Sequence, residues 1–198
     1  MKPISTIFFD WGGVIADDPG DDFLMSLLRQ IGATAAQAQE IYDGTMRRFM
    51  TGEISEIEYW QRLRDEYGFT IPDTISEEFK AWRGLAKNEA VLDLVHEAKS
   101  RGYTVALLTN VIEPTYNVLQ AEGCYEPFDA IIASCKVGYA KPDPAIYRIA
   151  LQQLDATPET SLFIEDKPKN IAPATQLGFQ TILAENSAQI IRDVRKYL

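Results

Sequence analysis

The sequence predicts an α/β fold in which a parallel sheet carries helices on both of its faces. Short, strongly apolar runs alternate along the chain with amphipathic stretches of helical period. Between the first and the second apolar run this alternation stops, and residues 18–86 have a different texture. With 198 residues, of which 46% are hydrophobic, the chain suits one large domain or a core with a small second unit.

The apolar runs are the expected strands, because each is short and is bounded by polar or turn-forming residues. They cover residues 4–10, 103–110, 128–134, 160–166 and 179–185. Helices are predicted over 88–102, 143–155 and 170–178. Asp143 suits the N-cap of the second helix, while Gly102 and Gly178 suit the positions after the C-termini of the other two. Strands and helices in this order indicate a Rossmann-like sheet.

Residues 18–86 contain no convincing strand and predict a helical unit inserted after the first strand. Its helices are expected over 21–32, 35–52, 55–68 and 76–86. In the third of these, helical spacing predicts one buried stripe of Ile57, Trp60, Leu63 and Tyr67. The predicted organisation is therefore an α/β core of residues 1–17 and 87–198 with an all-helical unit of residues 18–86.

The composition argues against several classes of binding partner. The net charge of −10 and the lack of a basic stripe argue against nucleic acid. We see no signal peptide and no apolar run long enough to cross a membrane. The two cysteines, Cys124 and Cys135, indicate no disulfide framework. We expect a cytoplasmic protein with reduced thiols, a monomer or a weak homodimer, in which any anionic substrate meets a local cation or a metal.

Polar side chains stand where the predicted strands end. The residues concerned are Asp10 after the first strand, Thr109 and Asn110 at the second, Lys141 in the loop beyond the third, and Glu165 and Asp166 at the fourth. In open α/β sheets ligands bind beyond the carboxyl ends of the strands. These side chains are therefore expected to converge, although the sequence separates them widely.

The types of these residues are complementary. Asp10 and Asp166 offer the oxygen ligands that Mg²⁺ prefers, and Lys141 offers a point charge for a phosphate or for a carboxylate beside it. Thr109 and Asn110 can donate neutral hydrogen bonds to the oxygens of an anion. A carboxylate nucleophile beside a metal, a cation and a hydroxyl indicates a site for phosphoryl transfer.

Four motifs in this order resemble the haloacid dehalogenase (HAD) superfamily, in the subgroup with a small helical cap of the C1 type. They are FFDWGGVIAD, LLTN, VGYAKPDPAIY and FIEDKPKN, and the stretch TGEISEIEYWQRL resembles the cap. The resemblance covers nearly the whole chain. It implies that the inserted unit of residues 18–86 is the cap.

The resemblance implies a role for each site residue. Asp10 would attack phosphorus, form an aspartyl-phosphate that water cleaves, and also bind Mg²⁺. The other metal ligands would be Asp166, the backbone carbonyl of Gly12, and Glu165 directly or as a supporting carboxylate. The phosphoryl group would be held by Thr109, Asn110 and Lys141, and Asn170 would support the metal site from behind.

The first motif departs from the usual pattern of the family. Phosphatases of the superfamily usually carry a second aspartate two residues after the nucleophile, as acid and base, and here that position is Gly12. The chain is similar in this to sugar-phosphate phosphatases with an Asp-x-Gly-(Gly/Asn)-Val turn. Asp17 and Asp18 follow closely, but we expect them to form a solvated acidic turn. Substrates with good leaving groups should then be favoured.

The leading interpretation is a Mg²⁺-dependent phosphatase of a small phosphorylated metabolite, for example a sugar phosphate. One alternative is a 2-haloacid dehalogenase, which needs no metal, and the acidic pair Glu165–Asp166 argues against it. Another is a regulatory domain that binds phosphate but hardly turns it over, which Gly12 motivates. Among residues of the insert, Arg47, Arg48, Trp82 and Arg83 could meet the leaving group, although we expect solvated arginines and a tryptophan in the insert's core.

Overall fold

The computed structural model describes residues 3–18, 21–72 and 86–198. Its centre is a five-stranded sheet in the order β3-β2-β1-β4-β5, and every neighbouring pair is parallel. The strands are β1 (Thr6–Phe9), β2 (Thr104–Thr109), β3 (Ala130–Ala133), β4 (Ser161–Glu165) and β5 (Gln180–Leu183). The predicted α/β fold is confirmed, and β1 lies at the centre of the sheet, where the strand order reverses.

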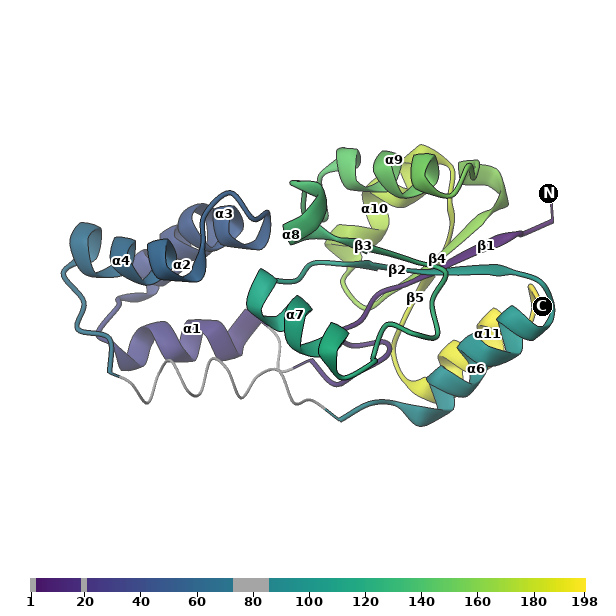
Figure 1. The fold of residues 1–198 in the computed structure, drawn as a ribbon, viewed down its shortest axis with the longest axis horizontal. Coiled ribbons are helices and arrows are strands. Elements are labelled where there is room, and N and C mark those ends of the chain that lie inside the picture. The colour runs from purple at the N-terminus through teal and green to yellow at the C-terminus, as the bar shows by residue number, and fades with distance from the viewer. Residues whose placement is uncertain (1–2, 19–20, 73–85) are drawn as a thin grey trace.

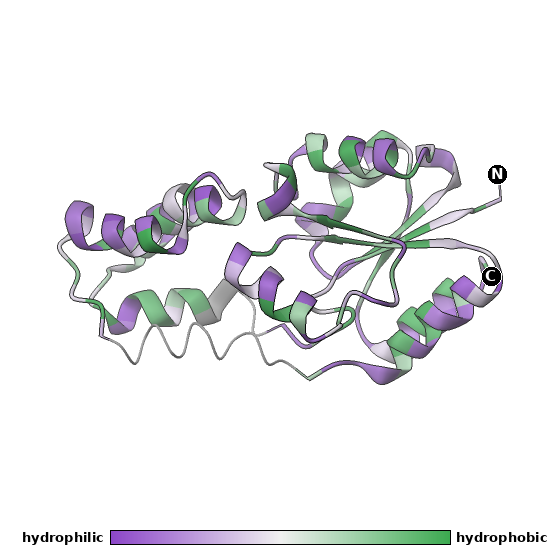
Figure 2. Cartoon of the chain, viewed as in Figure 1, coloured by the Kyte–Doolittle hydropathy of each residue, from purple (hydrophilic) through white to green (hydrophobic). Residues whose placement is uncertain are grey.

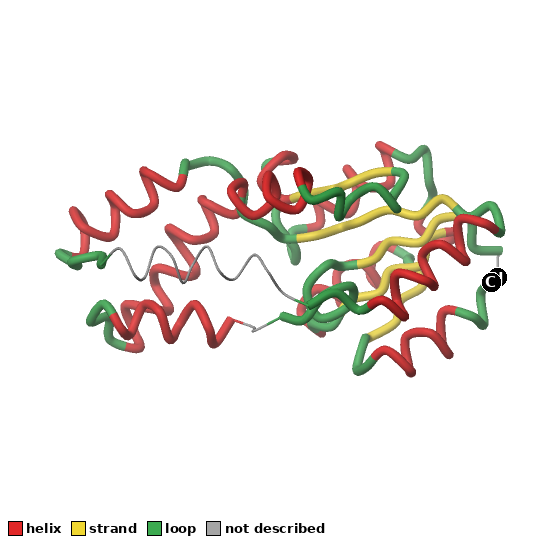
Figure 3. Tube along the Cα trace, turned by 60° about the horizontal axis from the view of Figure 1, so that its bottom comes forward, coloured by secondary structure: helices red, strands yellow, loops and turns green. Residues whose placement is uncertain are grey.

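Helices cover both faces of this sheet (Figure 1; Figure 3). They are α6 (Glu89–Ser100), α7 (Glu113–Ala121), α8 (Ser134–Val137), α9 (Pro144–Gln153), α10 (Pro168–Leu177) and α11 (Ser187–Val194), with a 3₁₀ turn at Pro158–Thr160. Successive residues of a strand point to opposite faces. Ile7 and Phe9 accordingly pack with α6 and α11, while Phe8 packs with α9 and α10.

Strands β1 and β4 are fully buried and β2 is nearly so, whereas Leu183 of the edge strand β5 is 41% exposed. The helices turn their apolar side inward (Figure 2). The residues predicted to end these helices are confirmed, although α10 begins at Pro168, before the expected residue 170. Asp143 caps α9 by accepting a hydrogen bond from the backbone of Ala145 at 2.9 Å, and Gly178 follows α10 with a φ of +102°. Asp143 thus starts α9, and Gly178 stops α10 where the chain has to turn toward β5.

The helical insert lies between β1 and β2 (Figure 1). Its buried apolar residues form a hydrophobic cluster that also includes Ile112, after β2. Its elements are α1 (Asp21–Gln30), α2 (Ala35–Ile41), a π-helical turn (Tyr42–Met46), α3 (Arg47–Met50) and α4 (Glu56–Tyr67). The helix expected over 76–86, including Trp82 and Arg83, lies almost wholly outside the described residues. The chain leaves and re-enters the core side by side, because Ala16 pairs with Lys87 and the amide of Asp17 donates to Ala86 at 3.1 Å.

Three details of the structure differ from expectation. The single helix expected over 35–52 is divided by the π-helical turn, and the loop expected after the third strand begins with the short helix α8. The predicted stripe on α4 is wrong at Ile57, which is 70% exposed. Tyr59 is fully buried in its place and stacks on Phe49 with ring centroids 5.1 Å apart.

No helix among the described residues is both long and apolar enough to span a bilayer. Cys124 and Cys135 are both free thiols, as predicted.

Candidate active site

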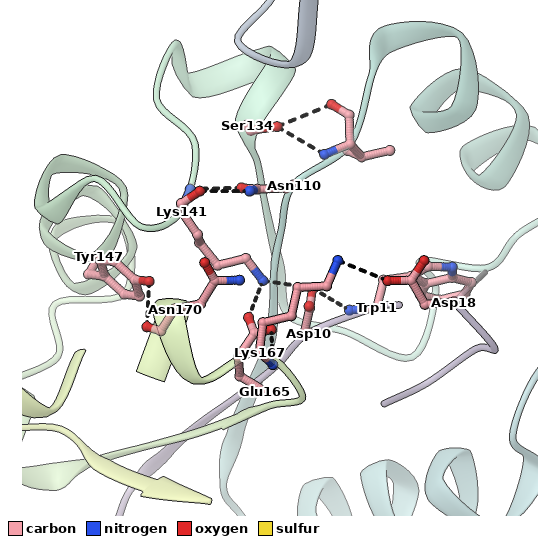
Figure 4. Close-up of polar contacts among 11 residues, drawn as sticks. Asp10, Trp11, Asp18, Asn110, Ser134, Lys141, Tyr147, Glu165, Lys167 and Asn170 are labelled. Carbon is pink, nitrogen blue, oxygen red and sulfur yellow. Dashed lines mark hydrogen bonds and ion pairs between the residues drawn. The ribbon is translucent and has the colours of Figure 1, made fainter. Parts of the chain in front are cut away.

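The residues predicted from the strand ends converge in the structure, and Figure 4 shows four of them, namely Asp10, Asn110, Lys141 and Glu165. A cavity of about 340 Å³ opens where the strand ends face the insert. Asp10, Gly12, Thr109, Asn110, Lys141 and Asn170 line it, and Glu165 and Asp166 adjoin Asp10. Ligand oxygens of Asp10, Glu165 and Asp166 all lie within 4.8 Å of one another. The parallel sheet thus brings carboxylates from two strands to one point.

Lys141 is the cation at the centre of this cluster and is 4% exposed. Its Nζ lies 2.8 Å from Oδ1 of Asp10 and 2.6 Å from Oε2 of Glu165. The backbone N–H of Trp11 also donates to Oδ1 of Asp10, at 2.7 Å. Both contacts of Asp10 therefore hold the same oxygen, which fixes the carboxylate and leaves Oδ2 for chemistry.

Burial and crowding shift the pKa values of the cluster. Burial, and then the charge of Glu165, raise the pKa of Asp10 to about 7, against the opposing effect of Lys141. Burial and Glu165 likewise raise the pKa of Asp166 to about 7. Burial acts to raise the pKa of Glu165 too, but Lys141, together with hydrogen bonds from Asp166 and the N–H of Lys167, outweighs it and the pKa is lowered. One lysine is too little positive charge for three ionised carboxylates.

Asn110 has a role that the sequence did not reveal. Its side-chain amide donates to the carbonyl of Lys141 at 2.9 Å, and its Oδ1 accepts from the N–H of Lys141 at 2.8 Å. The amide therefore clamps the backbone that carries the lysine, where we expected it to meet the phosphoryl group. The same residue also lines the cavity.

Ser134 was missed entirely by the sequence analysis. Its buried hydroxyl donates to the carbonyl of Met50 in the insert at 2.7 Å and accepts from the N–H of Val111 at 2.9 Å. This one side chain ties the insert to the loop after β2. A serine at the end of an apolar strand was the only signal in the sequence.

The turn after Asp10 explains why glycine occupies position 13. The amides of Ile15 and Ala16 both donate to the carbonyl of Trp11, so the chain folds back at once. Gly13 has a φ of +73°, and a Cβ there would lie 2.5 Å from Cγ and Oδ2 of Asp166. The missing side chain makes room for a carboxylate of the site.

We expect Gly13→Ala to displace Asp166 and to weaken any Mg²⁺ site it helps to form. Both the left-handed backbone and the collision oppose a methyl group, so the free energy of unfolding should fall by more than about 1 kcal/mol. Gly32→Ala is the matched control, because Gly32 has a φ of +95° but no atom within 4 Å of the added Cβ. Urea unfolding with and without Mg²⁺ measures both effects. Equal losses, with the Mg²⁺ response kept, would contradict the assignment.

The donor set fits a divalent cation. Oδ1 of Asp166 is buried without a hydrogen-bond partner among the described residues, and so is Oδ1 of Asn170. Both oxygens of Glu165 are engaged, by Lys141 at 2.6 Å and by the N–H of Lys167 at 3.0 Å. This favours Asp10 and Asp166 as the carboxylate ligands and Glu165 as the anchor of Lys141. Hard oxygen donors of this kind suit Mg²⁺.

The raised pKa values predict how stability depends on pH. Asp10 and Asp166 bind protons more tightly in the folded than in the unfolded chain. Their contribution is complete below about pH 4 and is lost as the pH rises through about 7. In EDTA, the free energy of unfolding should therefore fall between about pH 5.5 and pH 8. Mg²⁺ should reduce that fall, because it stabilises the ionised carboxylates. Urea titrations at both pH values check this, and stability in EDTA that rises with pH would refute it.

Asp18 does not lie in a solvated turn, and the expectation for it is wrong. It lines the cavity, its side chain is 15% exposed, and its Oδ2 lies 3.1 Å from Nζ of Lys167. A Cβ on Gly12 would lie 3.3 Å from Cγ of Asp18 and 3.4 Å from its Oδ2. The carboxylate of Asp18 thus fills the space beside Gly12 that a side chain at that position would enter. Asp17 is exposed, as expected.

The insert supplies the opposite wall of the cavity. Leu24, Tyr42, Asp43, Met46, Arg47 and Met50 line it. Arg48 does not, and pairs with Glu53 at 2.8 Å.

A family model described as haloacid dehalogenase-like hydrolase matches residues 4–178. The chain belongs to this family. The sequence resemblance to the HAD superfamily is thereby confirmed, and the protein is a HAD-like hydrolase.

The relatives of the chain include two phosphatases that it matches over most of its length. A D-ribitol-5-phosphate phosphatase of Bacteroides thetaiotaomicron is 28% identical over 204 residues, covering 93% of this chain and 94% of that protein. A sesquiterpene phosphatase of Aspergillus oryzae is 28% identical over 192 residues, covering 95% and 93%. Bifunctional epoxide hydrolase 2 of Rattus norvegicus is 31% identical over 170 residues, 78% of this chain. The match spans only 30% of that hydrolase.

Solved HAD-like structures share the fold. A predicted HAD-like hydrolase from Porphyromonas gingivalis superposes with a TM-score of 0.79 at 25% identity, over 98% of this chain and 97% of that chain. A HAD-family enzyme of Bacteroides thetaiotaomicron, in complex with magnesium and inorganic phosphate, superposes with a TM-score of 0.73 at 23% identity, over 92% and 96%.

Proposed function

We propose that the protein is a Mg²⁺-dependent phosphatase that hydrolyses a small phosphorylated metabolite through an aspartyl-phosphate on Asp10. The observation that carries the proposal is the placement of Asp10, held by Lys141 at 2.8 Å beside the carboxylates of Glu165 and Asp166. Two HAD-like relatives that match nearly full length are phosphatases, which supports it.

In the proposed reaction, Oδ2 of Asp10 attacks phosphorus and the bond from phosphorus to the alcohol oxygen breaks. The alcohol leaves with a proton from Asp18, and water, which returns a proton to Asp18, then attacks phosphorus to release phosphate and restore Asp10. Lys141, Thr109 and the backbone N–H of Asn110 hold the phosphoryl oxygens. When bound by Asp10, Asp166 and the carbonyl of Gly12, with Asn170 behind them, Mg²⁺ neutralises charge on the phosphoryl group.

We also propose that residues 18–86 act as a C1-type cap over a core of residues 1–17 and 87–198. The pairing of Ala16 with Lys87 supports these boundaries, because the insert begins and ends at one point of the core. The cavity between insert and strand ends gives such a cap its purpose, which is to cover the leaving group. A cytoplasmic location and a monomeric or weakly dimeric state stay predictions.

The test is phosphate release from a panel of monoesters, with Mg²⁺ and with EDTA. Turnover that requires Mg²⁺ supports the proposal. Halide release from a 2-haloacid in EDTA would establish the dehalogenase alternative. Tight binding of phosphate with no turnover on any ester would favour a regulatory domain.

The position of Asp18 beside Gly12 makes it the proposed proton donor to the leaving group. We expect Asp18→Asn to lower kcat/KM on alkyl phosphates by about 10² to 10⁴-fold, and much less on aryl phosphates, whose leaving groups need no proton. Asp17→Asn is the control, because Asp17 precedes it in the chain but is exposed. A loss that is equal for alkyl and aryl esters, or equal in both variants, would exclude this role.

A further inference from the structure

The residues that line the cavity also indicate the chemical class of the alcohol that the reaction would release. This inference rests on the proposed function. The two phosphatase relatives leave the alcohol open, since one is named for a sesquiterpene and the other for ribitol 5-phosphate. The polar residues at the strand ends are assigned to phosphate and metal. The remainder of the lining must therefore contact the alcohol.

The buried part of that remaining wall is apolar. Leu24 and Met46 come from the insert, and Ile112 and Leu119 come from the chain that follows β2. Each of the four is at most 5% exposed. Tyr125, at 8%, completes this wall. The five residues Leu24, Met46, Ile112, Leu119 and Tyr125 are called the apolar wall below.

The remaining charged residues of the lining are Asp18, Lys167, Asp43, Arg47 and Lys169, and the first two pair with each other at 3.1 Å. Asp43, Arg47 and Lys169 are all exposed. Each is also engaged elsewhere. Asp43 accepts from the side chain of Gln39 at 2.9 Å, Arg47 lies 4.0 Å from Asp143, and Lys169 lies over the ring of Tyr42, 5.6 Å from its centroid.

A polyol would be poorly matched to this arrangement. Every hydroxyl that it buried against the apolar wall would lose water without gaining a partner, which is costly. The hydroxyls of Thr115 and Tyr125 have no hydrogen-bond partner among the described residues, but both oxygens are buried within the wall. Methylene groups, by contrast, gain from every contact with such a surface.

We propose that the cavity selects phosphate monoesters of apolar alcohols, with the hydrocarbon against the apolar wall and the phosphate at Asp10 and Lys141. A volume of about 340 Å³ is that of a small-molecule pocket and accommodates a hydrocarbon chain of moderate length. This departs from the sugar phosphate that the sequence suggested. The specificity would reside in the walls of the insert and of the segment after β2.

The experiment compares esters of primary alcohols, so that the reacting bond stays the same while the alcohol changes. Ethyl, butyl, hexyl and octyl phosphate are compared with glycerol 3-phosphate and ribitol 5-phosphate. We expect kcat/KM to rise by about fourfold for each CH₂ group that is fully buried, and the polyol esters to be slower than hexyl phosphate. Hexylphosphonate, which cannot be hydrolysed, should bind more tightly than ethylphosphonate by calorimetry.

A variant of the wall tests the same idea. Met46→Gln keeps the length of the side chain and adds an amide, so the ratio of kcat/KM for hexyl to ethyl phosphate should fall by tenfold or more. Met25→Gln is the control, because Met25 also lies in the insert but does not line the cavity. That variant should keep the wild-type ratio.

The outcomes separate this inference from the proposed function. If p-nitrophenyl phosphate and ribitol 5-phosphate are hydrolysed and the rate does not rise with chain length, the phosphatase stands and the apolar substrate class is refuted. If no ester is hydrolysed, the phosphatase itself fails. The chain-length series needs only the wild-type protein, so it stays decisive even if Met46→Gln does not fold.

Discussion

Asp10→Asn is expected to abolish turnover of every phosphate ester while leaving the protein folded. An amide oxygen is a far poorer nucleophile than a carboxylate, and loss of a covalent nucleophile costs about 10³-fold or more in kcat. The fold should survive, because Lys141 retains Glu165 at 2.6 Å and the substitution removes a buried negative charge. Steady-state phosphate release and a urea unfolding curve measure the two halves of this prediction.

Trapping the intermediate makes the Asp10 prediction specific. Wild-type protein quenched in acid during turnover should carry one phosphoryl group, located by mass spectrometry on the peptide that contains Asp10. Asp10→Asn should carry none. Phosphoryl transfer to another residue, or substantial turnover by the variant, would remove Asp10 from the centre of the mechanism.

The sequence predicts the positions of those site residues that are set by the backbone of the sheet alone. Asp10, Thr109 and Glu165 each end a run of buried apolar residues, and parallel strands bring such ends together whatever the loops do. The same logic placed Lys141 correctly, although it lies beyond β3 in a loop. Strand ends are fixed by hydrogen bonds between backbones, so little side-chain detail is needed.

Roles that depend on tertiary contact were not predictable. The amide of Asn110 could serve a phosphate or the backbone of Lys141, and only the fold selects the latter. Asp18 stands six residues after Gly12, and the sequence does not show that the turn closes back on itself. A signal was nevertheless present, because a glycine in place of an expected carboxylate leaves a space that a nearby acid could fill.

Tertiary packing also decides which residue of α4 is buried. The helical period admits a stripe through Ile57 or one through Tyr59, since Ile57 lies one turn before Trp60 and Tyr59 lies one turn before Leu63. The structure buries Tyr59, whose ring stacks on Phe49 of α3, and leaves Ile57 in solvent. Only the position of the neighbouring helix separates the two alternatives.

Lys141→Met is the substitution with the largest expected effect on stability. Methionine has a similar length but no charge, so Asp10 and Glu165 would lose the cation that lies within 2.8 Å of both. Removing one partner of a buried ion pair typically costs about 3–5 kcal/mol, because the remaining charge stays buried and uncompensated. Activity should be lost too, since no other lysine lies within salt-bridge distance of Asp10 among the described residues.

Lys136→Met provides the matched control for this prediction. Lys136 pairs with Glu113 at 2.6 Å, but both side chains are more than a third exposed. An exposed pair of this kind contributes under about 1 kcal/mol. The control makes the same chemical change at a solvated ion pair. The difference between the two variants in the lost free energy of unfolding therefore measures the effect of burial.

The loss of stability in Lys141→Met should depend on pH and on Mg²⁺. Without the lysine, Asp10 and Glu165 are expected to bind protons more readily, so the variant should be closest to wild type at low pH and lose stability as the pH rises. Mg²⁺ should restore part of the loss by supplying charge beside the same carboxylates. Urea unfolding at about pH 5.5 and pH 8, with Mg²⁺ and with EDTA, measures this. A penalty that is small and the same in all four conditions would mean that Lys141 does not balance the buried carboxylates.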